Sequence, residues 1–232
     1  MKPIAIFRHS PGEGPGYFAT FLDSQSLPWT LFKLDEAVEP PPTPEGFSGL
    51  CFMGGPMSVN DDLPWIAPVL ELIREADRQG IPVIGHCLGG QLMAKAFGGT
   101  VARNPVKEIG WGRVEAAGAN PDWLGDAAGF EAFHWHGETF SIPPGATRLL
   151  QSAHCANQAF LRGRHLGMQC HVEMTSTMIE SWCHHWAAEG VPASASVQTP
   201  EQMLSGMEAR IAAMRVVADR LYMRWTRGLA GR

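Results

Sequence analysis

The chain has 232 residues, of which 45% are hydrophobic and 18% are charged, and its formal net charge is -5 at pH 7. Its 18 Lys and Arg residues are scattered and outnumbered by 23 Asp and Glu residues, so it lacks the basic surface that a nucleic acid or an acidic membrane would need. The length predicts a single globular domain over residues 1–232 that binds neither of these partners.

Two further features narrow the class of protein. The apolar run at the N-terminus is too short for a secretion signal, and no segment approaches the roughly 18 apolar residues of a membrane span, so we expect a cytoplasmic protein. The five cysteines form no Cys-x-x-Cys pair, which argues against a disulfide framework and a standard zinc site. We therefore expect reduced thiols, no metal and no cofactor. The cysteines are Cys51, Cys87, Cys155, Cys170 and Cys183.

The first half of the chain alternates short β-like runs with helix-like runs. The predicted strands are 3–7, 29–34, 49–53 and 81–85, and the predicted helices are 17–23 and 65–80. From about residue 99 the sequence is richer in predicted strands, at 100–104, 110–116, 130–136, 148–153 and 165–171. We therefore expect an α/β fold of three layers, with a mostly parallel sheet flanked by helices and extended by antiparallel strands, and a core of about 1–190.

The C-terminal segment predicts one long helix over about 199–228. Thr199 suits the N-cap, Pro200 the first turn and Gln202 the closing position of a capping box. An apolar stripe follows at spacings of three and four residues, formed by Leu204, Met207, Ile211, Met214, Ala218, Leu221 and Trp225. Such a stripe most often packs on its own domain. The alternative is a surface for a partner or for a second copy of the chain.

Cys87 lies where a predicted strand turns into a predicted helix, in the stretch GHCLGGQLMA. A sharp strand-to-helix turn strains its corner residue and requires small neighbours two positions away, which Gly85 and Gly89 provide. The corner side chain then lies at a helix N-terminus, where the dipole and the free amides favour thiolate over thiol. This pattern predicts a nucleophile. The alternative is a small buried side chain in a glycine-rich turn.

Two other stretches could complete such a site. In GMQCHVEM, an extended chain would place His171 and Glu173 on the same side, so that the carboxylate orients the imidazole of a general base. In CFMGGPMSV, Gly54 and Gly55 follow a predicted strand and could offer backbone amides to an oxyanion, together with the amide of Leu88. Taken singly, a His-x-Glu sequence and a Gly-Gly-Pro turn are both weak signals.

Taken together, the stretches GHCLGGQLMA, MGGPMSV, FHWHGETFSIPPGATRLLQSAHCANQAF and GMQCHVE resemble the triad-type class I glutamine amidotransferases. The resemblance covers about residues 45–180 and is strongest to free-standing proteins similar to the glutaminase domain of GMP synthase. It implies that Cys87 is the nucleophile, His171 the general base and acid, and Glu173 the orienting carboxylate.

The resemblance also implies a substrate site. Gln91 would help to hold glutamine, and the His136–Gly137 segment would border it. The backbone around Gly54, Gly55 and Leu88 would stabilise the tetrahedral oxyanion.

Two positions depart from the family pattern. Many members have a histidine where this chain has Gly90 and a proline where it has Val172. We expect both positions to lie at the mouth of the site, where Gly90 alters its shape without touching the nucleophile. Valine restrains His171 less than proline would, so we expect a slightly looser triad.

Other histidines and cysteines could bind a metal. His134 and His136 share one face of a predicted strand, and Cys183, His184 and His185 are adjacent in the sequence. Neither group has a recognised metal-site spacing, so we expect no metal there.

Three functions remain open. The first is hydrolysis of the glutamine side-chain amide through a γ-glutamyl thioester, which releases ammonia. The second is the same chemistry on a γ-glutamyl amide or peptide, with water as the final acceptor. The third is a non-catalytic redox sensor at the elbow cysteine. A sensor needs no base, so His171 and Glu173 favour the enzymes.

The acceptor of the ammonia is not encoded by any motif of the chain. There is no Gly-x-x-x-x-Gly-Lys-[Ser/Thr] loop, and the length after residue 190 is too short for an ATP-using synthetase domain. We therefore expect a synthetase partner or no transfer, possible homodimer formation, and at most weak glutaminase activity of the chain alone.

Overall fold

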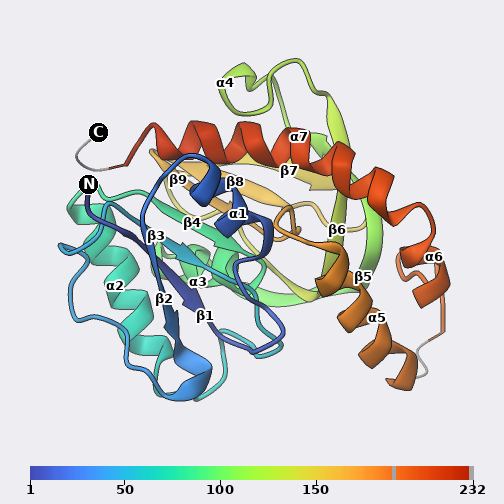
Figure 1. Cartoon of the computed structure of the whole chain (residues 1–232), viewed down its shortest axis with the longest axis horizontal. Coiled ribbons are helices and arrows are strands. Elements are labelled where there is room, and N and C mark those ends of the chain that lie inside the picture. Colours follow the sequence, from blue (N-terminus) through green and yellow to red (C-terminus); the bar gives the residue numbers. More distant parts are fainter. Residues whose placement is uncertain (190–191, 230–232) are drawn as a thin grey trace.

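The computed structural model describes residues 1–189 and 192–229, and within them a nine-stranded mixed sheet forms the centre of the fold (Figure 1). The strand order is β2 (Trp29–Lys33), β1 (Ile4–Arg8), β3 (Gly49–Phe52), β4 (Val83–His86), β9 (His165–Met168), β8 (Ala159–Arg162), β7 (Thr147–Ser152), β5 (Val101–Ala116) and β6 (Gly129–Phe140). From β2 to β9 neighbouring strands are parallel, and from β9 to β6 they are antiparallel. The predicted α/β fold with antiparallel additions is confirmed, and β9 returns to the parallel half beside β4.

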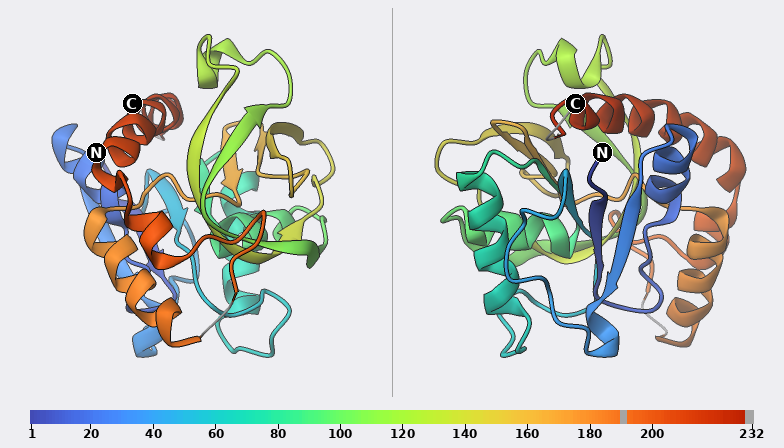
Figure 2. Two further views of the ribbon diagram at one scale, coloured as in Figure 1. Left: turned by 90° about the vertical axis from the view of Figure 1, so that its right-hand side faces the viewer. Right: turned by 60° about the vertical axis from the view of Figure 1, so that its left-hand side comes forward.

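Helices cover both faces of the sheet (Figures 1 and 2). α2 (Ile66–Arg78) and α3 (Leu88–Ala96) pack on one face. α1 (Gly16–Ser24), α5 (Ser176–Glu189) and α7 (Met207–Thr226) pack on the other. Because both faces are buried, β1 is apolar from Ile4 to Phe7, with Ile4 and Ile6 facing one helical layer and Ala5 and Phe7 the other. The remaining helices are short: η1 (Leu34–Glu36), α4 (Pro121–Leu124) and α6 (Pro200–Leu204).

The antiparallel half is built around one long hairpin. The two strands predicted at 100–104 and 110–116 are parts of the single strand β5, whose register against β6 shifts between Arg103 and Glu108. Figure 2 shows this light-green hairpin standing beside α7. β8, α4 and α5 were not predicted from the sequence.

The C-terminal segment forms two helices, so the prediction of one long helix is wrong. The predicted capping box is present, since the side chain of Thr199 accepts from the amide of Gln202 and the side chain of Gln202 accepts from the amide of Thr199. α6 ends at Leu204, and α7 begins after Gly206, which has the left-handed φ of 66°. Leu204 is 40% exposed, whereas the stripe from Met207 to Trp225 is buried against the domain. That stripe therefore offers no free surface to a partner.

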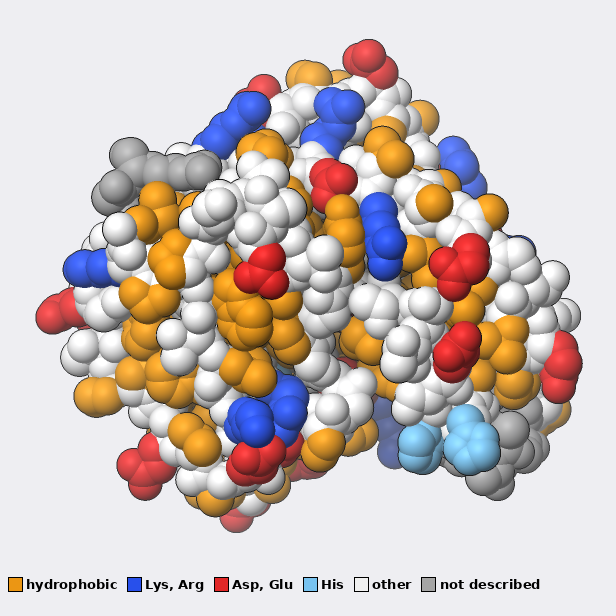
Figure 3. Space-filling view, viewed as in Figure 1, with side chains coloured by type: hydrophobic (Ala, Val, Ile, Leu, Met, Phe, Trp, Pro, Cys, Tyr) orange, Lys and Arg blue, Asp and Glu red, His pale blue; other side chains and the backbone are white. Residues whose placement is uncertain are grey.

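Among the helices of residues 1–189 and 192–229, none is both long and apolar enough to cross a membrane. On the face seen in Figure 3, acidic and basic side chains are scattered among hydrophobic and uncharged ones.

Candidate active site

Cys87 is the corner of a strained turn between β4 and α3. Its φ of 50° and ψ of -108° lie outside the conformations that non-glycine residues favour. A Cβ on Gly85 would collide with the backbone of Gly89, and a Cβ on Gly89 would collide with the carbonyl of Phe52. The two glycines therefore let the strand and the helix approach closely enough to hold Cys87 at the helix N-terminus.

His171 and Glu173 lie together behind Cys87, as the extended-chain prediction required. Nδ1 of His171 donates to Oε1 of Glu173 at 2.6 Å, and both side chains are buried. The chain is extended here because His171 exchanges two backbone hydrogen bonds with Phe133 of β6. Nε2 of His171 has no well-aligned hydrogen bond among the described residues and interacts with the sulfur of Cys87.

The electrostatics of this group favour an imidazolium. Burial by itself lowers the pKa of His171, but the charges of Glu173 and Cys87 outweigh burial and raise that pKa well above its usual value. Burial likewise raises the pKa of Glu173, yet the charges of His171 and His86 lower it to about 2. The arrangement can therefore hold a thiolate beside a protonated imidazole.

His86 lies beside the second carboxylate oxygen of Glu173. Nε2 of His86 is 4.0 Å from Oε2 of Glu173 and 3.1 Å from the hydroxyl of Tyr222 on α7, with which it forms a hydrogen bond. Burial lowers the pKa of His86. The C-terminal helix thus reaches the site through one buried hydrogen bond.

A cavity of about 850 Å³ opens above Cys87. Of the residues singled out from the sequence, Gly55, Cys87, Gln91, His136 and Gly137 line it. Nε2 of Gln91 donates to Oε1 of Gln169 at 3.1 Å, and Nε2 of Gln169 donates to Sγ of Cys87 at 3.5 Å. Gln91 therefore lies in the wall of the cavity and is connected to the thiol through Gln169.

Two free amides adjoin the cavity. Within the part of the chain that the structure describes, the amides of Gly54 and Gly55 donate to no acceptor. Leu88 is the first residue of α3, so its amide has no partner within the helix. Its side chain is buried and contributes only packing. These amides are suited to an oxyanion at Cys87.

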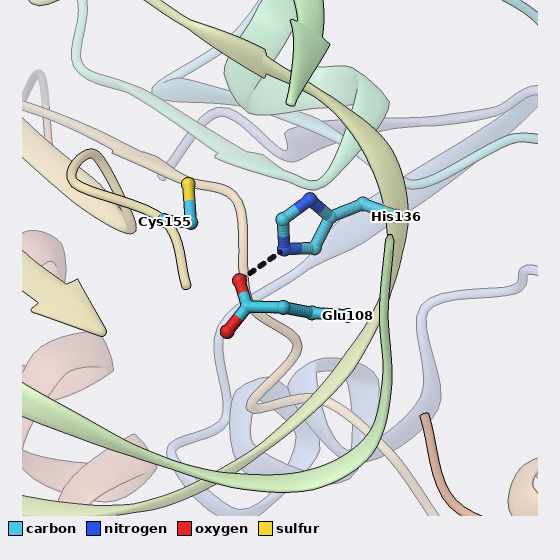
Figure 4. Close-up of side chains that lie close together, drawn as sticks. All are labelled: Glu108, His136 and Cys155. Carbon is cyan, nitrogen blue, oxygen red and sulfur yellow. Dashed lines mark ion pairs between the residues drawn. The ribbon is translucent and has the colours of Figure 1, made fainter. Parts of the chain in front are cut away.

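His136 is held by a buried polar network (Figure 4). Its Nε2 lies 3.1 Å from Oε2 of Glu108, and its Nδ1 lies 3.0 Å from the carbonyl of Glu138. Glu108 also accepts hydrogen bonds from Ser152 and Gln158. These contacts fix the ring at the cavity wall.

The same network contains three potential metal ligands. Ligand atoms of Glu108, His136 and Cys155 lie within 4.8 Å of one another. Because both oxygens of Glu108 already accept hydrogen bonds, we interpret the cluster as support for His136. The second group of candidate ligands is not buried together. Cys183 is buried, whereas His184 and His185 are exposed.

The expectation that Gly90 and Val172 lie at the mouth of the site is wrong. A Cβ on Gly90 would collide with the carbonyl of Met168, so this position is packed under β9. Val172 is fully buried in the core, because it points to the opposite side of the extended segment from its two neighbours. Neither side chain borders the cavity.

Several side chains of the site were not predicted from the sequence. Gln169 stands in the quoted Gln-x-His-x-Glu pattern, which was the available signal for it. Glu13 and Trp182 also line the cavity, but neither has a local motif. Only the tertiary fold brings them to Cys87.

Comparison with known proteins agrees with this site. The family model described as glutamine amidotransferase class-I matches residues 22–182. The glutamine amidotransferase-like protein YfeJ of Salmonella typhimurium is 30% identical over 188 residues, which cover 76% of this chain and 78% of that protein. A GMP synthase of Thermomicrobium roseum is 35% identical over 136 residues, which cover 57% of this chain and only 24% of that protein.

Solved structures agree in fold. The glutamine amido transferase of Methylobacillus flagellatus has a TM-score of 0.96 and 45% identity, with 99% of this chain and 96% of that chain covered. A glutamine amidotransferase of Thermotoga maritima has a TM-score of 0.86 and 25% identity, with 96% and 97% covered. The chain belongs to the class I glutamine amidotransferase family.

Proposed function

We propose that the chain hydrolyses the side-chain amide of glutamine through a γ-glutamyl thioester on Cys87 and releases ammonia. One observation carries the proposal: a strained cysteine at a helix N-terminus lies beside the buried, hydrogen-bonded pair of His171 and Glu173. The relatives support it, because the GMP synthase of Thermomicrobium roseum is named as glutamine-hydrolysing.

The thiolate, the imidazole and the backbone amides have separate roles in the reaction. The thiolate of Cys87 attacks the γ-carbonyl carbon, and the amides of Gly54, Gly55 and Leu88 stabilise the oxyanion. His171 donates its proton to the departing nitrogen, so that ammonia leaves and the thioester remains. His171 then takes a proton from water, which attacks the thioester and releases glutamate.

The remaining side chains bind and orient. Glu173 holds the His171 ring and stabilises its protonated form. Gln91 and the His136–Gly137 segment hold the glutamyl part of the substrate at the cavity wall. The pair formed by His136 and Glu108 keeps that wall in place.

A second candidate function is hydrolysis of larger γ-glutamyl amides or peptides, with water as the acceptor. The cavity of about 850 Å³ favours it, because glutamine alone would leave much of that space unfilled. A redox sensor is the weakest candidate, since it would need no buried pair of base and carboxylate.

No motif of this chain identifies an acceptor for the ammonia. The GMP synthase relatives are much longer than the matched region, and the chain contains no phosphate-binding loop of the P-loop type. A synthetase partner that docks over the cavity would receive the ammonia. We therefore expect slow turnover of glutamine by the chain alone.

The experiment is ammonia release from glutamine by the purified wild type and the Cys87→Ala variant. Slow release that the variant abolishes supports the glutaminase. Rapid cleavage of a larger γ-glutamyl amide with glutamine untouched supports the second candidate instead. Equal rates for the wild type and the variant would refute the assignment of the nucleophile.

A further inference from the structure

Side chains of opposite formal charge line the cavity above Cys87. One is Lys107, which packs along Gly137, where its Cγ would lie 3.4 Å from an added Cβ. A cation here suits the α-carboxylate of a glutamyl group. The other is Glu13 of the loop after β1, and Trp182 of α5 also lines the cavity.

Glu13 adjoins the proposed proton donor. A Cβ on Gly54 would collide with Oε2 of Glu13 and would lie 3.3 Å from Cε1 of His171, so the carboxyl and the imidazole approach the same point. The departing nitrogen must face His171 to receive its proton. The leaving group of the substrate therefore extends toward Glu13.

The carboxyl of Glu13 lacks a counter-charge of its own. Its side chain forms no hydrogen bond or ion pair with any residue that the structure describes. Burial raises the pKa of Glu13 to about 7, and the charge of Glu173 adds to this shift while that of His171 opposes it. A bound cation would supply the missing charge and keep the carboxyl ionised.

Aromatic side chains lie near the loop that carries this carboxyl. The ring of Trp182 lies 5.2 Å from that of His171 at an interplanar angle of 85°, and 5.3 Å from that of Trp135. Nε1 of Trp182 donates to the carbonyl of Gly12 at 3.0 Å, which ties α5 to the loop that carries Glu13. A carboxylate next to indole rings is a combination that binds ammonium groups.

We propose that Glu13 and Trp182 form a leaving-group subsite for a cationic amine, so that the chain also hydrolyses γ-glutamyl amides of diamines. The inference rests on the proposed function, because it assigns further lining residues of the same cavity. The amide C–N bond breaks as the thioester forms on Cys87, the departing amine takes the proton of His171, and water then releases glutamate. The distal ammonium of the diamine stays paired with Glu13 until the product leaves.

A charge series tests the proposal independently of turnover. Three γ-glutamyl amides of similar length are compared: γ-glutamylputrescine, which ends in an ammonium, its n-pentylamide analogue, which ends in a methyl group, and γ-glutamyl-4-aminobutyrate, which ends in a carboxylate. Dissociation constants are measured by calorimetry on the Cys87→Ala variant. We expect the ammonium compound to bind about 10- to 100-fold more tightly than the methyl compound, and the carboxylate compound to bind most weakly.

Two variants in the same background locate the effect. Glu13→Gln keeps the shape of the side chain and should reduce the preference to about twofold or less. Glu180→Gln removes an exposed carboxylate of α5 and should keep the full preference. Trp182→Leu should weaken binding of the ammonium compound more than that of the methyl compound.

Equal affinity for the ammonium and methyl compounds would overturn the proposal. So would a full preference that survives in Glu13→Gln. Failure of the proposed function has a different signature, namely no release of glutamate or ammonia by the wild-type chain from any of these amides or from glutamine. In wild type, faster release of glutamate from γ-glutamylputrescine than from the pentylamide would add kinetic support.

Discussion

Replacing Glu173 with Gln should weaken the nucleophile as well as the base. The carboxylate accepts from Nδ1 of His171 at 2.6 Å in a fully buried setting, and a hydrogen bond to a charged group contributes roughly 1.5–3 kcal/mol. Loss of the carboxylate should therefore lower the pKa of His171, because the charge of Glu173 is the main cause that raises it.

Loss of the Glu173 carboxylate also changes how alkylation of Cys87 depends on pH. A protonated His171 stabilises the thiolate of Cys87, so a less basic imidazole should slow alkylation by iodoacetamide most at the acidic end of the pH profile. Glutamine turnover should fall by about 10³- to 10⁴-fold without vanishing, because an orienting group matters less than the base.

The assay needs a matched control and a criterion for failure. Glu131→Gln removes an exposed carboxylate that pairs with Arg210 at the surface, and its alkylation profile should match that of the wild type. An unchanged profile and wild-type turnover in Glu173→Gln would refute the role assigned to this carboxylate.

Three further predictions follow from the packing around the site. Gly89→Ala should lower the free energy of unfolding by about 1–3 kcal/mol, because the added Cβ meets a carbonyl of β3. Gly46→Ala, with open space around it, should be neutral in the same denaturation assay. Tyr222→Phe removes the hydrogen-bond partner of Nε2 of the buried His86, so denaturation should show a loss of about 1–3 kcal/mol and turnover should fall. Unchanged values for both would refute the role of this hydrogen bond. Val172→Pro should keep activity, because the amide it removes makes no hydrogen bond within the described chain. A folded but inactive variant would contradict this prediction.

The elements that sequence patterns predicted best are those whose geometry is local. The elbow follows from Gly85, Cys87 and Gly89 because a strand and a helix that meet over a few residues leave no room for side chains there. The contact of His171 with Glu173 follows from the two-residue period of extended chain. Both depend on neighbours in the sequence, which is why a single sequence reveals them.

Features that depend on distant packing were missed or placed wrongly. Glu13 and Trp182 come from the loop after β1 and from α5, and only the tertiary fold brings them to one cavity. Gly90 was expected at the mouth because it neighbours the nucleophile in sequence, but the helix turns it under β9. The break at Gly206 was hidden, since the spacing of three residues from Leu204 to Met207 fits an unbroken helix.

The central claim is that Cys87 carries the γ-glutamyl group, and covalent labelling tests it most directly. The wild-type chain is incubated with a diazoketone analogue of glutamine, and the modified peptide is identified by mass spectrometry. The account predicts a single adduct on Cys87, formed more slowly when excess glutamine competes. Among the described residues, only this thiol lies at a helix N-terminus in the wall of the cavity. An adduct on Cys155 or Cys170 with Cys87 unmodified would contradict it.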